Sequence, residues 1–131
     1  MNPADLFRHE KETVNLAPGE ILFEHGDPGR EMFVVIEGLL EIRVGTQVVE
    51  SAGPGTMLGE MALIDESPRT ASVVATAPSR LARINLHRFH FLVQQNPFFA
   101  SHVMKIMVER IRHMNQRLQI HSSVSFESAK L

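Results

Sequence analysis

The chain has 131 residues, which is enough for one domain with its own hydrophobic core. Hydrophobic residues make up 44% of it, charged residues 21%, and the net charge is −2. Lysine and arginine are scattered, which argues against a large nucleic-acid-binding surface. Cysteine is absent, and this excludes disulfides, thiolate metal sites, iron–sulfur clusters and cysteine nucleophiles.

The amino end lacks the apolar region of a signal peptide. No apolar run approaches the roughly 18 residues that are needed to span a bilayer. We therefore expect a cytoplasmic protein, with no membrane segment in this chain.

Turn residues divide the first two thirds of the chain into short apolar runs. A short helix is expected over Pro3 to Lys11, docked by Leu6 and Phe7. The runs expected to form strands are 13–16, 21–23, 32–36, 39–44, 47–49, 71–76 and 80–86. Many short strands at close spacing favour a barrel, sandwich or roll over alternating βαβ units.

The apolar period changes after the last expected strand. Residues 86–95 are expected to form a short helix, Asn96 to cap the next one, and Pro97 to occupy its first turn, where a missing N–H costs nothing. This second helix should run to about Leu118 or Gln119. Residues 122–131 are expected to form a flexible tail.

The long helix carries two apolar stripes. One contains Phe99, Val103 and Ile106; the other contains Ala100, Met104, Met107, Ile111, Met114 and Leu118. The second set alternates spacings of three and four, as coiled-coil helices do. It could face a ligand, a partner subunit or both, or the two stripes could form one broad face in a static core.

Residues 58–71 have the pattern of an anion site. Gly59 precedes about one turn of good helix formers, and Arg69 follows the breaker Ser67-Pro68. Backbone N–H groups at a helix start have no partner inside the helix and carry the positive end of its dipole, so they can hold a phosphate. Arg69 offers a planar fork of donors that matches two phosphate oxygens. Glu60 suits a hydroxyl better than a phosphate.

This segment resembles the phosphate-binding cassette of cyclic nucleotide-binding domains. The resemblance rests on Gly59-Glu60-Met61-Ala62-Leu63 followed by Ser67-Pro68-Arg69-Thr70-Ala71, with Arg69 nine residues after Glu60. It continues upstream through 18–20, 23–27 and 33–38. In total it covers roughly Ala17 to Phe89.

The resemblance implies how a cyclic nucleotide is held. Arg69 would bind the phosphate, and Glu60 the ribose 2′-hydroxyl. The backbone around Gly59, Met61, Ala62 and Leu63 would make further contacts. Thr70 and Ala71 would complete the ligand-binding residues, and the hydroxyl of Thr70 could add a hydrogen bond to the phosphate or the base. A hydroxyl residue at Thr70 is compatible with cGMP as well as cAMP, and cAMP is the expected ligand.

The resemblance also implies a mainly β fold, an antiparallel jelly-roll-like β-roll with a short phosphate-binding helix and C-terminal helices. The domain would cover residues 1–121, with an N-terminal helical segment at 1–12, the roll at 13–86, the cassette at 58–71 and the C-terminal helices at 87–121. Two departures from the commonest family pattern are Leu58, where phenylalanine is frequent, and a short N-terminal helical region.

The implied function is that of a regulatory module, and not an enzyme, which signals by movement of its C-terminal helices. Its effector would be a partner protein or a domain outside this chain. Neither nucleic-acid nor membrane binding is expected here, but a homodimer through the 97–119 helix is possible. The base should meet the long helix, with four polar candidates that the sequence does not rank: Arg110, Arg112, His113 and Asn115.

Two other classes of function were considered. One is a cupin-like metal-binding enzyme, but His87 and His90 have no third ligand nearby and no His-x-His pair is present. No metal or cofactor is therefore expected. The other is an oligomerisation module without a ligand. The presence of both Glu60 and Arg69 argues against it.

Overall fold

The computed structural model describes residues 2–121. Its elements, in chain order, are α1 (Pro3–Leu6), β1 (Thr13–Leu16), β2 (Ile21–Phe23), β3 (Glu31–Glu37), β4 (Leu40–Val44), β5 (Gln47–Ala52), β6 (Met57–Leu58), α2 (Glu60–Asp65), β7 (Ser72–Ala75), β8 (Ser79–Asn85), α3 (Leu86–Gln95) and α4 (Pro97–His121). The expected mainly β fold with flanking helices is confirmed.

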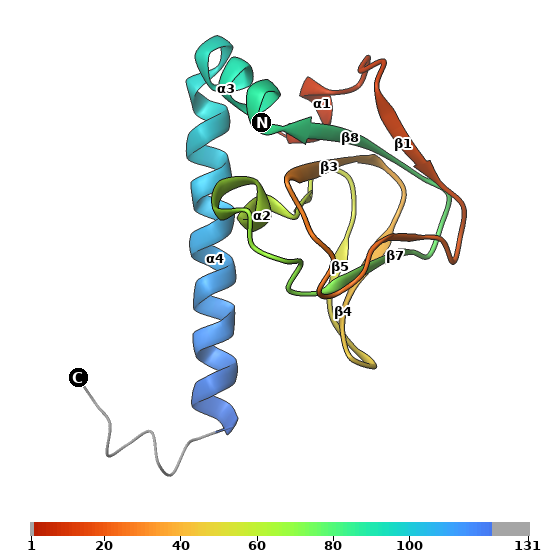
Figure 1. Cartoon of the computed structure of the whole chain (residues 1–131), viewed down its shortest axis with the longest axis vertical. Helices are drawn as coiled ribbons and strands as arrows, with labels where there is room; N and C mark the ends of the chain where they lie inside the picture. Colours follow the sequence, from red (N-terminus) through yellow and green to blue (C-terminus); the bar gives the residue numbers. More distant parts are fainter. Residues whose placement is uncertain (1, 122–131) are drawn as a thin grey trace, which may run out of the picture.

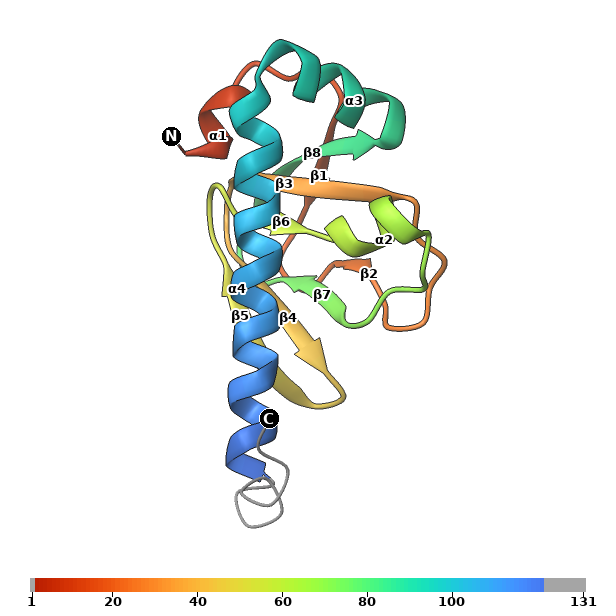
Figure 2. The ribbon, with the colours of Figure 1, turned by 90° about the vertical axis from the view of Figure 1, so that its left-hand side faces the viewer.

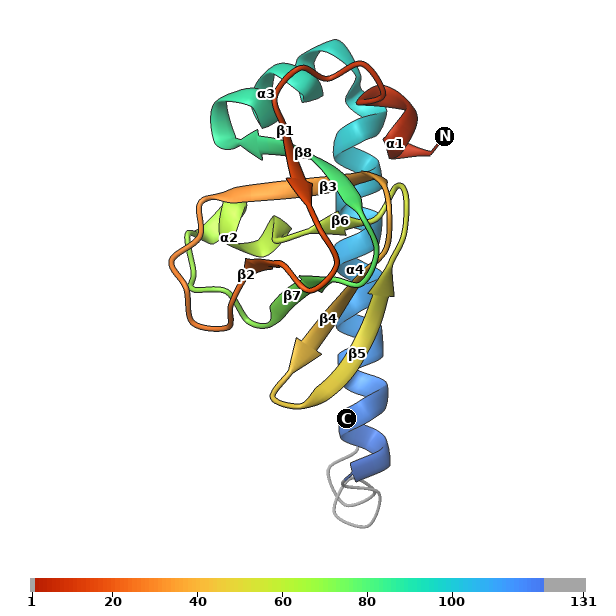
Figure 3. The same ribbon diagram turned by 90° about the vertical axis from the view of Figure 1, so that its right-hand side faces the viewer.

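The strands form two antiparallel sheets. One has the order β1-β8-β3-β6 and the other the order β2-β7-β4-β5. Figure 1 shows the two sheets curling around a common interior, with α4 along one side and α2 between α4 and the strands. Figure 3, which is turned by 90° from Figure 1, shows β1, β2 and β7 on the side away from α4.

The central strand β3 supplies both cores of the domain. Alternate residues of a strand point to opposite faces. Phe33 and Val35 join a buried cluster between the two sheets. Met32 and Val34 join a second cluster, which Phe7, Phe99 and Val103 complete from the helices. The helices are therefore packed onto one face of the first sheet.

The N-terminal helix is shorter than expected. It covers only Pro3–Leu6, where the side chain of Asn2 accepts a hydrogen bond from the N–H of Ala4. Phe7 ends it by entering the core, where its ring meets Phe99 edge-on with centroids 6.1 Å apart. The expectation that Leu6 docks the helix is wrong, since Leu6 is 40% exposed. The helix therefore ends at Leu6, before the end that the local sequence predicts, and Phe7 packs in the core instead.

The two C-terminal helices begin and end close to their expected positions. Asn85 caps α3 by accepting from the N–H of Arg88. The N–H of Asn96 donates to the carbonyl of Leu92, and its carbonyl accepts from the N–H of Phe99. Asn96 thus joins α3 to α4 through its backbone, and Pro97 is the first residue of α4 as expected.

The two stripes of α4 have different surroundings. Phe99 and Val103 of the first stripe are buried, and Ile106 packs against them. In the second stripe, Met107 packs against the same core, but Met104 is 58% exposed and Ile111 51% exposed. Figure 2, in which α4 crosses in front of the strands, shows that its end extends past the hairpin of β4 and β5.

Several boundaries differ from the expectation. Residues 57–58 form β6, a strand of two residues that sequence reasoning missed, and β5 runs on to Ala52. The tail expected at 122–131 lies outside the described residues. Among the helices that are described, none is both long and apolar enough to cross a membrane.

Candidate functional site

The first part of the site is the turn between β6 and α2. Leu58 pairs with Phe33 of β3, and Gly59 then adopts the left-handed conformation with φ of +76° at the N-cap of α2. A Cβ at Gly59 would collide with Nη1 of Arg69. Glycine is therefore required twice here, for the backbone conformation and for the close approach of Arg69. Because glycine has no side chain to cap the helix, the first N–H groups of α2 remain available to a ligand.

Arg69 is brought to this turn by its backbone. Its N–H donates to the carbonyl of Asp27 and its carbonyl accepts from the N–H of Gly26, both at 2.8 Å. The guanidinium lies 4.2 Å from the ring centroid of Phe23, and its Nη1 donates to the carbonyl of Gly59 at 3.3 Å. These contacts fix the direction of the side chain, which is only 6% exposed.

The surroundings of Arg69 favour an anion. Burial lowers the pKa of its guanidinium, and the negative charges of Glu31, Asp27 and Glu60 oppose that effect. Its Nε is buried and has no hydrogen-bond partner in the described structure. A buried cation with an unused donor is costly unless a counter-charge reaches it.

Glu60, the first residue of α2, is the most buried carboxylate of the site at 2% exposure. Its Oε1 forms an ion pair with Nη1 of Arg110, which reaches it from α4. Its Oε2 is buried and has no hydrogen-bond partner among the described residues. One oxygen is thus held by protein, and the other can accept from a ligand hydroxyl.

Arg110 connects three elements. Besides Glu60, its Nη2 donates to Oε2 of Glu50 on β5 at 3.0 Å and to the carbonyl of Met57 on β6 at 2.7 Å. Burial alone would lower the pKa of Arg110, but the carboxylates of Glu60 and Glu50 outweigh burial and raise the pKa. The guanidinium is therefore charged and holds α4 against the site.

These residues surround a cavity of about 320 Å³. The predicted site residues that line it are Gly59, Glu60, Met61, Ala62, Arg69, Thr70 and Ala71. Leu63 does not line it, because its side chain is buried in the core cluster beneath the helices; only its backbone could take part, and that stays a prediction. Apolar side chains, Phe23, Ile42, Val44 and Val49, complete the wall.

Two of the four polar candidates on α4 line the cavity. Arg110 and His113 line the cavity, whereas Arg112 and Asn115 are exposed and do not. Sequence reasoning missed Glu50, which also lines it. No local signal marks Glu50, since its position follows from the pairing of β5 with β4 and from a contact with a residue 60 positions away.

Residues 13–96 of the chain match the family model for the cyclic nucleotide-binding domain. The chain belongs to this family. A cAMP-dependent protein kinase regulatory subunit from Hypocrea atroviridis is 34% identical over 82 residues, covering 63% of this chain and 18% of that protein. A cyclic AMP receptor protein from Thermus thermophilus is 30% identical over 117 residues, covering 86% of this chain and 53% of that protein.

Solved structures have the same fold. The crystal structure of the Thermus thermophilus catabolite activator protein superposes with a TM-score of 0.77 at 26% identity, over 92% of this chain and 59% of that one. The antiparallel β-roll implied by the resemblance is therefore confirmed. This cyclic nucleotide-binding domain spans about half the length, or less, of the curated relatives named above.

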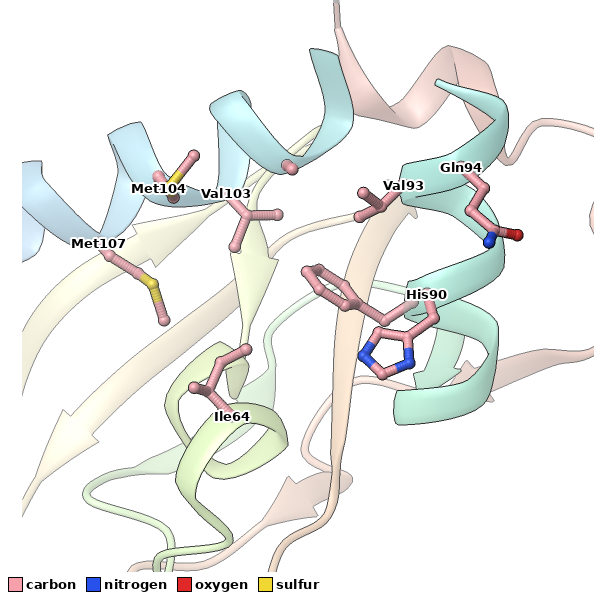
Figure 4. Close-up of a pocket in the computed structure, with 9 residues that line it drawn as sticks. Ile64, His90, Val93, Gln94, Val103, Met104 and Met107 are labelled. Atoms are coloured by element: carbon pink, nitrogen blue, oxygen red, sulfur yellow. The ribbon is translucent and has the colours of Figure 1, made fainter. Parts of the chain in front are cut away.

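A second, larger hollow lies between α2, α3 and α4. Its volume is about 590 Å³, and its lining includes Ile64, Val93, Val103 and Met107. In Figure 4 these side chains point toward one another across the space between the three helices, while Gln94 points away. Its lining contains no Asp, Glu, Lys or Arg. We therefore take the smaller cavity, which contains the buried charges of Glu60 and Arg69, as the candidate site.

The comparisons give no support to the cupin-like alternative. Among the residues that the structure describes, no group of three or more His, Cys, Asp or Glu side chains is arranged to hold a metal ion. The cavity offers the unused donor of Arg69, the unused carboxylate oxygen of Glu60 and helix N–H groups, which suit an organic anion with a hydroxyl.

Proposed function

We propose that this domain binds cAMP in preference to cGMP, in the cavity beside α2, and that binding acts through α4. The observation that carries the proposal concerns Arg69 and Glu60. Within the described residues, the buried side-chain polar atoms that lack a partner are Arg69 Nε, a donor, and Glu60 Oε2, an acceptor. A cyclic phosphate joined to a ribose would satisfy both.

The phosphate would be bound by Arg69 together with backbone N–H groups. Arg69 supplies charge and a donor that the protein itself leaves unused. The helix start at Gly59 to Leu63 supplies neutral donors, and Thr70 and Ala71 border the same cavity. Burial of the guanidinium strengthens its attraction for an anion, because little water screens the charges.

The ribose would be bound by Glu60. Its Oε1 is engaged by Arg110, which fixes the direction of the carboxylate and leaves Oε2 without a partner among the described residues. A 2′-hydroxyl that donates to Oε2 gains a charge-assisted hydrogen bond without displacing Arg110.

The preference for cAMP is supported by the two relatives described above, which are named for cAMP. The proposed action through α4 is supported by Arg110, since the carboxylate that would touch the ribose also contacts α4. A ligand shifts the equilibrium between two positions of α4 only as far as its binding free energies for the two positions differ. The effector would be a partner protein or a further domain of a longer chain.

Calorimetric titration with cAMP, cGMP and 5′-AMP tests the binding proposal. We expect one cAMP site per chain, with weaker binding of cGMP. 5′-AMP should bind weakest, because its phosphate is not held by the ring and carries a second negative charge. Absence of binding heat with both cyclic nucleotides at several temperatures, in protein shown to be folded, would refute the proposal.

We also propose that α4 forms a homodimer through the stripe that includes Met104 and Ile111, both of which are exposed. Exposed apolar residues at coiled-coil spacing on one helix favour a helix partner. Light scattering after size exclusion should give a dimer for the wild type and a monomer for Met104→Lys. The matched control Gln116→Lys, at an exposed position of α4 outside the stripe, should stay dimeric. A monomeric wild type at all concentrations would contradict the proposal.

A further inference from the structure

Two residues far from Arg69 in the sequence, Gly29 and Phe23, lie against its side chain. We propose that both are positioning residues for the guanidinium. Gly29, which has no side chain, leaves the space that the guanidinium occupies, and Phe23 holds it there by the face of its ring. Arg69 is thereby oriented for an anion before a ligand arrives. This inference rests on the proposed function and adds to it two residues that act through Arg69.

Hydrogen bonds alone do not hold the end of this side chain. Nη1 of Arg69 donates to the carbonyl of Gly59 at 3.3 Å, which is long for such a bond, and Nε has no partner among the described residues. An arginine has many rotamers, and ordering them at the moment of binding weakens the affinity for a ligand. Contacts that order the side chain beforehand therefore strengthen binding.

Gly29 acts by the atoms that it lacks. A Cβ at this buried position would lie 2.5 Å from Nε and 2.6 Å from Cζ of Arg69, well inside van der Waals contact. The loop cannot easily move away, because the N–H of Gly26 and the carbonyl of Asp27 are hydrogen-bonded to the backbone of Arg69 at 2.8 Å. The guanidinium, at the end of a flexible side chain, would turn aside instead.

The backbone of Gly29 does not require glycine. Its φ lies outside the left-handed region, unlike that of Gly26 or Gly59. An alanine therefore fits the backbone conformation at this position, and the collision with Arg69 is the main effect that we expect from it. Gly29→Ala should thus change the site and leave the fold nearly as stable as before.

Phe23, the last residue of β2, is fixed by the core. It packs against the cluster between the two sheets, with its ring centroid 6.2 Å from that of Phe33. Cζ of Arg69 lies 4.2 Å from the centroid of the Phe23 ring, within the range in which an aromatic face attracts a cation. Because Arg69 is only 6% exposed, water weakens this attraction little.

The first test measures cAMP affinity by calorimetric titration in two altered proteins. One is Gly29→Ala, and the other carries pentafluorophenylalanine in place of Phe23, a ring of similar shape whose face no longer attracts a cation. We expect binding to weaken about tenfold or more in the first and about threefold to tenfold in the second. Thermal unfolding should show that both proteins are folded.

Each change has a matched control. Gly53→Ala adds a Cβ at another glycine outside the left-handed region, where it would meet no atom within 4 Å. Pentafluorophenylalanine in place of Phe98 alters a ring that is 76% exposed and does not line the cavity. Both control proteins should bind cAMP as the wild type does.

The Arg69→Ala background separates positioning from other roles. If Gly29 and Phe23 act through Arg69, neither change weakens cAMP binding further once the guanidinium is absent. The same loss of affinity with and without Arg69 would mean that the two residues contact the nucleotide or disturb the fold, and it would overturn the inference.

A second test needs no ligand. Nε of Arg69 is buried near the Phe23 ring, so its proton should have a ring-shifted NMR signal that exchanges slowly with water; loss of the signal in Arg69→Ala assigns it. In Gly29→Ala the signal should move to the position of an exposed arginine and exchange faster. An unchanged signal would contradict the positioning role. If the signal moves as expected but the wild type binds no cyclic nucleotide, the positioning is supported and the proposed function is refuted.

Discussion

Arg69→Ala is expected to weaken cAMP binding by about two to three orders of magnitude. The variant leaves the bound phosphate in a buried site without its counter-charge, which costs about 3–5 kcal/mol, and each 1.4 kcal/mol corresponds to about one decade of affinity. The ligand-free protein should remain folded, because the substitution also removes a buried cation whose Nε has no partner. Calorimetric titration measures the affinity, and thermal unfolding without nucleotide checks the fold.

The matched control for Arg69 is Arg112→Ala. Arg112 is an exposed arginine of α4 that does not line the cavity, so its loss should leave cAMP affinity within about twofold of the wild type. Equal cAMP affinity in Arg69→Ala and the wild type would show that the phosphate binds elsewhere.

Arg110→Met is expected to lower the free energy of unfolding by about 3 kcal/mol or more in the absence of nucleotide. It leaves the carboxylate of Glu60, which is almost fully buried, without its partner, and an uncompensated buried charge costs this much. The carboxylates that pair with Arg110 raise its pKa, so its stabilising effect is fully present at neutral pH and is lost only as the pH rises through the folded-state value. Urea denaturation followed by circular dichroism gives the change.

A second substitution distinguishes the charge from the packing. In the double variant Arg110→Met, Glu60→Met the orphaned carboxylate is gone, and at least half of the lost stability should return. The carboxylate of Glu50 also loses its partner in Arg110→Met, but it needs no second substitution because it is partly exposed to water. Stability of Arg110→Met within about 0.5 kcal/mol of the wild type would contradict the view that α4 is fastened to the site through Glu60.

The gathering of Gly59, Glu60 and Arg69 around one cavity could be predicted because its signals are local. Gly59, the short helix and Arg69 follow one another within a dozen residues, and each has a chemical role that its residue type allows. The structure brings Gly59, Glu60 and Arg69 together around one cavity, as the spacing predicts. Their contacts with a nucleotide remain predictions.

The parts that sequence reasoning missed depend on contacts between distant residues. Phe7 ends α1 because Phe99, far along the chain, receives its ring. The two residues of β6 form a strand only because β3 pairs with them. The sequence placed Arg110 among four equivalent polar residues, and only the position of α4 against β5 and α2 shows that it reaches Glu50 and Glu60.

The most direct test of the account is a crystal structure of this domain with cAMP. We expect a phosphate oxygen within hydrogen-bond distance, about 2.7–3.2 Å, of the Arg69 guanidinium, and the ribose 2′-hydroxyl donating to Oε2 of Glu60. Nucleotide bound instead in the apolar hollow between α2, α3 and α4, with Arg69 still without an anion, would contradict it.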